Sequence, residues 1–363
     1  MARLGDYVKI RTGKLDANAS SDNGQYPFFT CSVEPLKIDT YSYDCECVLV
    51  AGNGDLNVKY YNGKFDAYQR TYIIESNNKS VLSVPYLYCF LDKYVETLRK
   101  QSIGGVIKYI KLGNLTEAEI PLCDIKEQNE IVKILEKANS LIADRKTQLS
   151  KLDELIKARF VEMFGDPLCN KMNWDTNSVE NLCSNIYGGG TPSKSHPEYY
   201  ENGDIPWVSS KDMKTNVLYD SQIRINQLGI DNSTAKMVPI NSVIMVIRSG
   251  ILKHTLPVAI NAVPVTVNQD LKVFIPSNQM LSVFLMYQFK MLEKDILSGV
   301  RAVTADNIEF NSLKERMIIV PPIELQNEFA TFVEQIDKSK FEVQQSLEKL
   351  ETLKKSLMQQ FFG

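Results

Sequence analysis

Residues 125–131 read IKEQNEI, and a close copy, IELQNEF, returns 198 positions later at residues 323–329. The alignment continues without a gap to the Met-Phe-Gly and Phe-Phe-Gly tripeptides that end at Gly165 and Gly363. Across residues 123–165 and 321–363, 12 of the 43 aligned positions are identical. The sequence therefore has an internal pseudo-twofold repeat, which suits a protein that binds a target with two halves.

Both copies are predicted to form long helices. No Gly or Pro interrupts the stretch from Lys126 to Phe164, and the Gly-Asp-Pro that follows at residues 165–167 is a helix stop signal. At 1.5 Å per residue, each helix would be about 58 Å long. On one copy alone, an ordinary helical hairpin that only holds a domain together is the simpler interpretation, whereas the duplication favours a dedicated spacer.

The spacing of apolar residues in both copies indicates a coiled coil, because it averages 3.5 residues over more than four heptads. Eight of the ten positions of this seam are apolar in each copy, and each charged exception aligns with an apolar residue of the other copy. We therefore expect the two helices to cover one another as an antiparallel pair. The seam comprises Ile131, Leu135, Ala138, Ile142, Arg145, Leu149, Leu152, Ile156, Arg159 and Met163 in the first copy, and Phe329, Val333, Ile336, Lys340, Val343, Leu347, Leu350, Lys354, Leu357 and Phe361 in the second.

Length and composition indicate a globular protein of two or three domains, since the chain has 363 residues, of which 44% are hydrophobic and 23% charged. No apolar run is long enough to span a bilayer, and the first residues lack the apolar core of a signal peptide, so we expect a cytoplasmic protein without membrane contact. The seven cysteines include no C-x-x-C motif and no His/Cys cluster. We expect free thiols and neither a metal nor a cofactor.

Net charge argues weakly against nucleic-acid binding, because it is −3 and nucleic-acid-binding domains are usually basic. Two local segments differ from this average. Residues 205–275 contain seven Lys or Arg and four Asp, a balance of +3, and residues 93–111 contain five Lys or Arg and one Glu, a balance of +4. These basic segments are candidate anion-binding surfaces, although a solvated surface with no ligand would carry the same charges.

The two segments that precede the helices, residues 1–122 and 167–320, are predicted to consist of short apolar strands with little helical periodicity. Similar short motifs occur in the same order in both segments. Residues 26–32 pair with 205–211, residues 47–54 with 242–250, and residues 68–74 with 268–275. We predict a mixed α/β fold built from two copies of one unit. The expected domains are residues 1–122 and 167–320, with long spacer helices at 123–166 and 321–363.

In this order, several short motifs resemble the specificity subunit of type I restriction-modification enzymes. These motifs are Gly189-Gly190-Thr191-Pro192, Gly203-Asp204-Ile205-Pro206-Trp207, Arg248-Ser249-Gly250, Asn268-Gln269, Ile323 with Gln326-Asn327-Glu328, and the basic, Phe-rich end from Leu353 to Phe362. The resemblance covers nearly the whole chain. The first copy departs from it in having Tyr-Pro-Phe at residues 26–28 where the second has Ile-Pro-Trp.

This resemblance implies two target recognition domains, each reading one half of a split site in double-stranded DNA, held apart by an antiparallel coiled coil. It also implies protein partners: two methyltransferase subunits and, in the full complex, a subunit for restriction and translocation. A specificity subunit is not itself an enzyme, and no cofactor is implied.

Catalytic motifs are missing from the sequence. Its two histidines, His196 and His254, both lie in the second half, so no Ser–His or Cys–His pair can be repeated in both halves. There is no G-x-x-x-x-G-K-[ST] phosphate loop. A methyltransferase would need a Gly-rich cofactor loop and an Asn/Asp-Pro-Pro-aromatic tetrapeptide, and the sequence has neither. We expect no catalytic residues.

Base readout requires side chains that can form two hydrogen bonds with a base edge, and phosphate binding requires Lys, Arg, Ser, Thr or backbone N–H groups. Such residues lie in or beside predicted turns of both halves. The predicted DNA-binding residues are Thr30, Ser32, Asn53, Asn57, Lys59, Gln69, Arg70 and Lys108 in the first half, and Thr191, Ser209, Ser210, Lys211, Lys214, Arg248, Lys253, His254, Gln269 and Arg301 in the second. Each of them could equally be an exposed loop residue without a role, and Trp207 is predicted to be a core aromatic.

Two other functions remain open from the sequence. One is a non-catalytic coiled-coil scaffold that uses the same two domains to bind proteins rather than DNA. The other is a chain with methyltransferase activity of its own, which the missing motifs disfavour. Salt-dependent binding to duplex DNA separates the first from a specificity subunit, and a labelled-methyl assay on the isolated chain settles the second.

Overall fold

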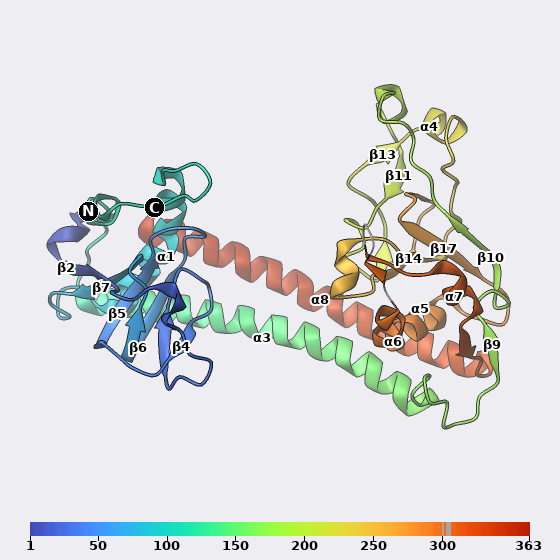
Figure 1. Cartoon of the computed structure of the whole chain (residues 1–363), viewed down its shortest axis with the longest axis horizontal. Helices are drawn as coiled ribbons and strands as arrows, with labels where there is room; N and C mark the ends of the chain where they lie inside the picture. Colours follow the sequence, from blue (N-terminus) through green and yellow to red (C-terminus); the bar gives the residue numbers. More distant parts are fainter. Residues whose placement is uncertain (300, 303–305) are drawn as a thin grey trace. The chain divides into compact units, whose positions relative to one another are not determined.

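The computed structural model describes residues 1–299, 301–302 and 306–363, except for the side chains of residues 301 and 302. Its longest elements are the helices α3 (Ile125–Phe164) and α8 (Ile323–Phe362), each 40 residues long (Figure 1). The second begins and ends 198 residues after the first. The repeat in the sequence is therefore a repeat in the structure, and the two predicted long helices are confirmed.

The chain divides into two compact units that each contain half of both long helices. Unit 1 comprises Met1–Gln148 and Val343–Gly363, and unit 2 comprises Leu149–Glu342. Both are mixed α/β, as predicted. The predicted bounds of the four domains are not tested by this division, because the division cuts each long helix in two.

Within each unit, the halves of α3 and α8 run antiparallel. In unit 1, Lys146 forms an ion pair with Glu351 at 3.2 Å. In unit 2, Asp153 pairs with Lys340 at 2.6 Å, and Arg159 pairs with Glu328 at 2.8 Å. Higher numbers on α3 thus meet lower numbers on α8. None of the predicted seam residues is exposed, so the antiparallel pairing is confirmed, while supercoiling of the two helices remains a prediction.

Unit 1 is built on a six-stranded sheet with the strand order β2-β7-β5-β6-β3-β4. Its strands are β2 (Val8–Thr12), β3 (Tyr26–Phe29), β4 (Leu36–Ile38), β5 (Tyr43–Ala51), β6 (Val58–Ala67) and β7 (Thr71–Ser76). All pairs are antiparallel except β3 with β6. The sheet is apolar on both faces, because Val48 and Val50 belong to one buried cluster, whereas Cys47 and Leu49 belong to another.

Helix α1 (Val84–Gln101) covers one face of this sheet and packs against β5 and β6 (Figure 1). The prediction of little helical periodicity is wrong here. Apolar residues recur at 84, 87, 91, 95 and 98, which is helical spacing, and all of them are buried. The alternation of Tyr86, Tyr88 and Phe90 along the same stretch imitates a strand, since aromatic residues at period two are typical of sheets.

Smaller elements complete unit 1. They are β1 (Ala2–Arg3), which pairs with β8 (Glu119–Ile120), the short 3-10 helices Leu4–Asp6 and Ala17–Ala19, and α2 (Leu112–Thr116). The ends of the long helices enter the same core: Ile131 and Leu135 of α3 and Met358 and Phe362 of α8 are buried with α1 and the sheet.

Unit 2 has a five-stranded sheet with the order β10-β17-β14-β15-β12 and a three-stranded sheet with the order β13-β11-β16. Strand β20 (Met317–Ile319) pairs with β9 (Thr176–Ser178). The two sheets comprise β10 (Cys183–Gly188), β11 (Ile205–Val208), β12 (Val217–Leu218), β13 (Arg224–Ile225), β14 (Val243–Val246), β15 (Val258–Asn261), β16 (Thr266–Val267) and β17 (Leu271–Pro276).

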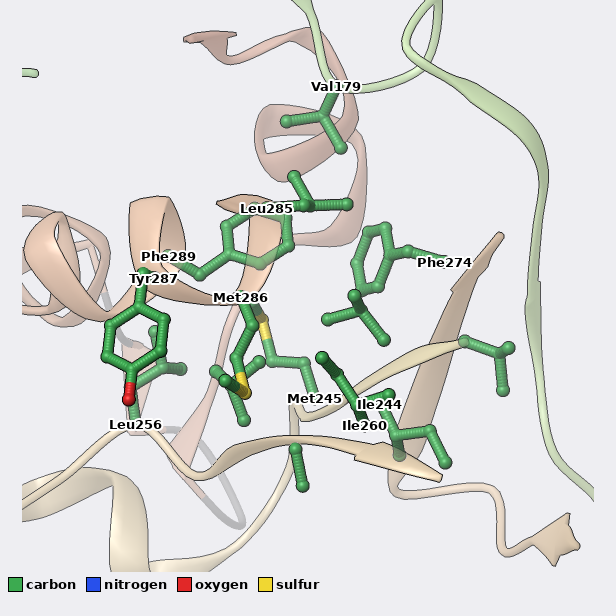
Figure 2. Close-up of a cluster of buried hydrophobic side chains, with 14 of the residues drawn as sticks. Val179, Ile244, Met245, Leu256, Ile260, Phe274, Leu285, Met286, Tyr287 and Phe289 are labelled. Carbon is green, nitrogen blue, oxygen red and sulfur yellow. The ribbon is translucent and has the colours of Figure 1, made fainter. Parts of the chain in front are cut away.

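The helices of unit 2 are short apart from its halves of α3 and α8. They are α4 (Gln227–Asp231), α5 (Ser282–Met291), α6 (Glu293–Ser298) and α7 (Phe310–Glu315). Figure 2 shows Leu285, Met286 and Phe289 of α5 directed toward Ile244, Met245 and Phe274 of the sheet, and all of these side chains are buried.

The strands of the two units match in register. Phe28 and Phe29 of β3 pair in parallel with Asp66 and Ala67, and Trp207 and Val208 of β11 pair in parallel with Thr266 and Val267. Trp207 is 6% exposed, and its indole N–H donates to the carbonyl of Gly190 at 2.9 Å. The predicted core role of Trp207 is therefore confirmed, and Phe28 takes the same place in unit 1.

A buried glutamine fastens the start of α3 to unit 1. The side-chain carbonyl of Gln128 accepts from the N–H of Ser83 at 2.9 Å, at the start of α1. Its amide donates to the carbonyls of Val81 at 2.7 Å and Cys123 at 2.9 Å. Three backbone groups are thus satisfied by one side chain that is fully buried.

The same arrangement recurs at the start of α8. Gln326 accepts from the N–H of Leu281 at 2.9 Å and donates to the carbonyls of Gln279 at 3.0 Å and Pro321 at 2.9 Å. Each partner lies 198 positions after its counterpart in unit 1. The QNE motif that reveals the repeat in the sequence is therefore the junction between each long helix and its domain.

Candidate nucleic-acid interface

In unit 1, backbone hydrogen bonds join several loops at the ends of β3, β5 and β6. The N–H of Gly52 donates to Arg70 O at 2.8 Å, that of Gly54 to Lys108 O at 2.9 Å, and that of Ile110 to Gly52 O at 2.9 Å. We call this arrangement the loop frame of unit 1. It comprises residues 30–33, 52–57, 68–70 and 103–110.

Unit 2 repeats these bonds. The N–H of Ile247 donates to Asp270 O at 2.9 Å, that of Ser249 to Asp306 O at 3.1 Å, and that of Ile308 to Ile247 O at 2.9 Å. The loop frame of unit 2 comprises residues 209–214, 247–254, 268–270 and 306–308. The frame places Arg248 where unit 1 has Asn53, and Asp270 where unit 1 has Arg70. The pairing of segments predicted from the sequence is therefore confirmed for the backbone, except that Gly54 corresponds to Ser249 rather than to Gly250.

A glycine at the edge of each frame permits the close approach of two strands. A Cβ atom added to Gly13 would clash with the carbonyl of Ala67, and one added to Gly189 would clash with the carbonyl of Val267. Ala67 and Val267 each directly precede the third loop of their frame, which is residues 68–70 in unit 1 and residues 268–270 in unit 2. A larger residue at either place would push this loop away from the others.

Side chains of unit 1 converge around residues 30–32. The thiol of Cys31 donates to Asn53 Oδ1 at 2.9 Å, and the amide of Asn57 donates to the carbonyl of Cys31 at 2.8 Å. Lys59 donates to Asn57 Oδ1, and burial lowers the pKa of this lysine. The predicted residues Asn53, Asn57 and Lys59 thus lie together.

The remaining predicted residues of unit 1 belong to the same frame. Thr30 is buried and donates to the hydroxyl of Ser32 at 3.2 Å. Gln69 and Arg70 are exposed and line a shallow pocket of about 290 Å³ together with Thr12, Gly52, Tyr72 and Ile110. Lys108 is exposed and joined to the frame through its carbonyl. The structure therefore gathers the full set predicted for unit 1.

In unit 2, an ion pair dominates the frame. The guanidinium of Arg248 contacts one carboxylate oxygen of Asp270 at 2.6 Å, and the amide of Asn268 donates to the other at 3.1 Å. Nearly half of the Arg248 side chain remains exposed (48%). Asp270 therefore fixes the direction of the arginine fork while leaving it accessible, a role for Asp270 that sequence reasoning missed.

Four more predicted residues of unit 2 belong to the loop frame or contact it. The hydroxyl of Thr191 donates to Oε1 of Gln269, which stands between Asn268 and Asp270. Lys253 lies 3.8 Å from the carboxylate of Asp306, whose carbonyl accepts from Ser249 in the frame. His254 follows Lys253 and is exposed.

The turn after β11 is less closely tied to this group. The hydroxyl and the N–H of Ser209 both donate to the carboxylate of Asp212 at 2.8 Å, so this hydroxyl serves to close its own turn. Ser210 is partly exposed, and Lys211 and Lys214 are exposed. Neither lysine forms an ion pair within the described part of the chain. The side chain of Arg301, the last predicted residue, lies outside the described residues.

Two further observations concern metal ions and membranes. Within residues 1–299, 301–302 and 306–363, no three His, Cys, Asp or Glu side chains are grouped so that they could hold a metal ion. In the same part of the chain, no helix combines the length and the apolar character that crossing a membrane requires.

Comparison with known families decides the identity of the fold. The family described as "Type I restriction modification DNA specificity domain" matches residues 1–153 and 171–354. The chain belongs to this family. The resemblance inferred from the motifs of the sequence is confirmed, and the match to residues 1–153 includes the first copy, which lacks the Ile-Pro-Trp motif.

Curated members of this specificity-domain family have similar sequences. The specificity subunit of the type I restriction enzyme EcoDI from Escherichia coli is 37% identical over 154 residues, which are 42% of this chain and 34% of that protein. The EcoR124I/EcoR124II specificity subunit from the same species is 32% identical over 275 residues, which are 72% of this chain and 64% of that protein. The chain thus spans about one third and just under two thirds of the length of these relatives.

Solved structures support the specificity-domain fold. The type I restriction-modification S subunit from M. genitalium superposes with a TM-score of 0.63 and 15% identity, covering 100% of this chain and 95% of that one. A chain from a structure described as showing the assembly and conformational transition of the type I R-M system has a TM-score of 0.59 and 15% identity, covering 99% and 96%.

Proposed function

We propose that this chain is the DNA-recognition subunit of a type I restriction-modification enzyme and has no catalytic activity of its own. It reads a split site, one half with each loop frame. The observation that carries this proposal is the duplicated frame: the backbone hydrogen bonds are the same in both units, while the side chains that the frames present differ. A repeated scaffold with divergent readers is what recognition of two different half-sites requires.

The chemistry of the frames fits base readout. Arg248 presents a fork held by Asp270, and an arginine fork pairs with O6 and N7 of guanine through two hydrogen bonds. Asn53, Gln69 and Gln269 carry amides, which suit adenine. The exposed lysines Lys108 and Lys211, and Lys214 beside Lys211, supply the positive charge that phosphate contacts need.

A pair of leucines on the long helices supports two protein partners. Leu155 of α3 and Leu353 of α8 are equivalent in the repeat, and they are 47% and 51% exposed. Exposed lysines repeat beside them, at 151 and 349 and at 157 and 355. Packing explains why buried residues recur at equivalent places in the two long helices, but it does not explain why exposed residues do. Two copies of one methyltransferase subunit, docked on equivalent faces, would use them, and a restriction and translocation subunit would complete the enzyme.

Absence of catalysis rests on the sequence. The histidines His196 and His254 both lie in unit 2, so neither has a counterpart in unit 1, and no phosphate or methyl-donor motif is present. The ring Nδ1 of His196 bonds to Glu198 at 2.8 Å on an exposed turn. We therefore assign methyl transfer and cleavage to the partner subunits.

The purified chain should bind duplex DNA with a logarithmic affinity that falls linearly as the logarithm of the salt concentration rises, because neutralised phosphates release counterions. It should transfer no labelled methyl group from S-adenosylmethionine to DNA until a methyltransferase subunit is added. Filter binding between 50 and 200 mM salt and a labelled-methyl assay provide the measurements. Salt-independent association with proteins and none with DNA would instead identify a protein scaffold, and methyl transfer by the chain alone would identify an enzyme.

Arg248→Ala should weaken binding to the cognate duplex by about 1–3 kcal/mol and relax the requirement for one base, because a bidentate contact is lost. Arg248→Lys is the matched variant: it retains the charge but not the fork, so base readout should fail with it as well. Lys211→Ala should weaken all sequences alike and reduce the salt slope by about one. Affinities for a set of single-base variants of the target give these results, and unchanged binding by all three proteins would place the DNA on another face.

A further inference from the structure

The last segment of the unit 1 frame is a small, well-defined hairpin. Ile103 and Tyr109 exchange two backbone hydrogen bonds, at 3.0 and 2.9 Å, and so close a loop of five residues. Gly104 has φ +118°, and a Cβ atom there would lie 2.5 Å from the carbonyl oxygen of Ile107. The conformation therefore depends on glycine. We call residues 103–109 the tip hairpin.

The tip hairpin exposes two adjacent apolar side chains at its end. Val106 is fully exposed and Ile107 is 61% exposed. Single exposed apolar residues are ordinary on protein surfaces. Two neighbouring exposed β-branched residues on one tip are different, because a loop without a ligand would lose nothing by carrying polar side chains there.

Basic residues flank this apolar tip along the chain. Lys100, Lys108 and Lys111 are exposed, and Arg99 lies 3.4 Å from Asp55, a carboxylate of the neighbouring loop. Residues 93–111 carry a net charge of +4 in total. An apolar tip flanked by basic residues is suited to bind a polyanion that also has an apolar interior.

The place of the hairpin in the frame identifies that polyanion. Asn53 and Tyr109 form an antiparallel bridge, and the N–H of Gly54 donates to the carbonyl of Lys108. The tip hairpin is thus attached to the loop that carries the candidate base-reading residue Asn53. Any DNA that meets Asn53 lies within reach of this hairpin.

We propose that the tip hairpin is a wedge that inserts Val106 and Ile107 into a base-pair step of the half-site read by unit 1. This inference rests on the proposed function. Apolar wedges of Phe, Leu, Ile, Met or Pro enter between base steps, partly unstack them and kink the duplex. The wedge makes unit 1 sensitive to how easily that step deforms, which is a form of sequence readout without a base-edge hydrogen bond.

The test uses the complete chain with its methyltransferase partner and a duplex that carries the methylated motif mapped in cells. 2-Aminopurine, a base that brightens when it is unstacked, is placed at successive steps of the half-site that unit 1 reads, but not at the methylated adenine, because a methyltransferase flips that base out of the stack itself. The test variant is Val106→Ser/Ile107→Ser. Val81→Ser is the control, because Val81 is also exposed and β-branched but precedes the other end of α1.

Wild-type protein and the Val81→Ser control should raise the fluorescence at one step. The double variant should lose this increase and bind about tenfold more weakly or worse, because two apolar side chains no longer leave water. Unfolding temperatures of all three proteins should agree, since the changed residues are exposed.

Four results would overturn the wedge. Wild-type protein that binds DNA without a fluorescence increase at any step, or a double variant that keeps the increase, rejects the wedge and leaves the proposed function intact. A double variant that binds DNA normally but no longer assembles with the methyltransferase subunit shows that the hairpin contacts protein. No binding of wild-type protein to DNA rejects the proposed function, and with it this inference.

Discussion

A variant with one heptad inserted after Leu149 and another after Leu347 should direct methylation to a motif whose unread gap is about three base pairs longer than the original. Seven residues lengthen a helix by about 10 Å, and B-DNA rises about 3.4 Å per base pair. The ion pairs Lys146–Glu351 and Asp153–Lys340 bracket both insertion points. A heptad at each point preserves the seam on both helices.

The heptad variant should also bind more weakly than the wild type. Three additional base pairs rotate the second half-site by about 100°, since B-DNA has about 10.5 base pairs per turn. A heptad changes the direction of the helix face by far less. Affinity should therefore fall even for a duplex with the longer gap.

Insertion of only two residues at each point is the control for this experiment. It breaks the seam, so the protein should unfold or aggregate. Mapping methylated adenines in cells that express each variant with its partners gives the result. A folded heptad variant that methylates the original motif with the original gap would show that the helices do not set the spacing.

Much of the fold could be predicted from the sequence because long helices have local, periodic signals. The stop at Gly165 and the repeated QNE motif predict α3 and α8 closely. The role of Gln128 could not be predicted, because it depends on backbone groups more than 40 positions away that only the folded domain brings near. Helix α1 was missed because its aromatic residues alternate like those of a strand.

The candidate site, too, could be predicted from the sequence only in part. Turn residues such as Asn53 and Arg248 could be chosen from their chemistry and their place in the repeat. The Arg248–Asp270 ion pair joins residues 22 positions apart through a strand pair, so the sequence alone did not reveal it. The sequence marks the tip hairpin only as part of the basic segment 93–111, since exposure of Val106 and Ile107 is a property of the tertiary structure.

Exchange of one recognition domain should change half of the methylated motif and leave the other half intact. The two loop frames carry different side chains at equivalent places, with Asn53 and Arg70 in unit 1 against Arg248 and Asp270 in unit 2. If each frame reads its own half-site, replacing residues 167–320 with the corresponding segment of another member of the family alters only what unit 2 reads. The reciprocal exchange, of residues 1–122, should alter only the other half.

The most direct measurement is a genome-wide map of methylated adenines in cells that express each chimaera together with the methyltransferase subunits. Independent reading by two frames predicts two short half-motifs separated by a constant gap, with one half replaced in each chimaera and the gap unchanged. A motif that changes in both halves after a single exchange, or one without a gap, would contradict it.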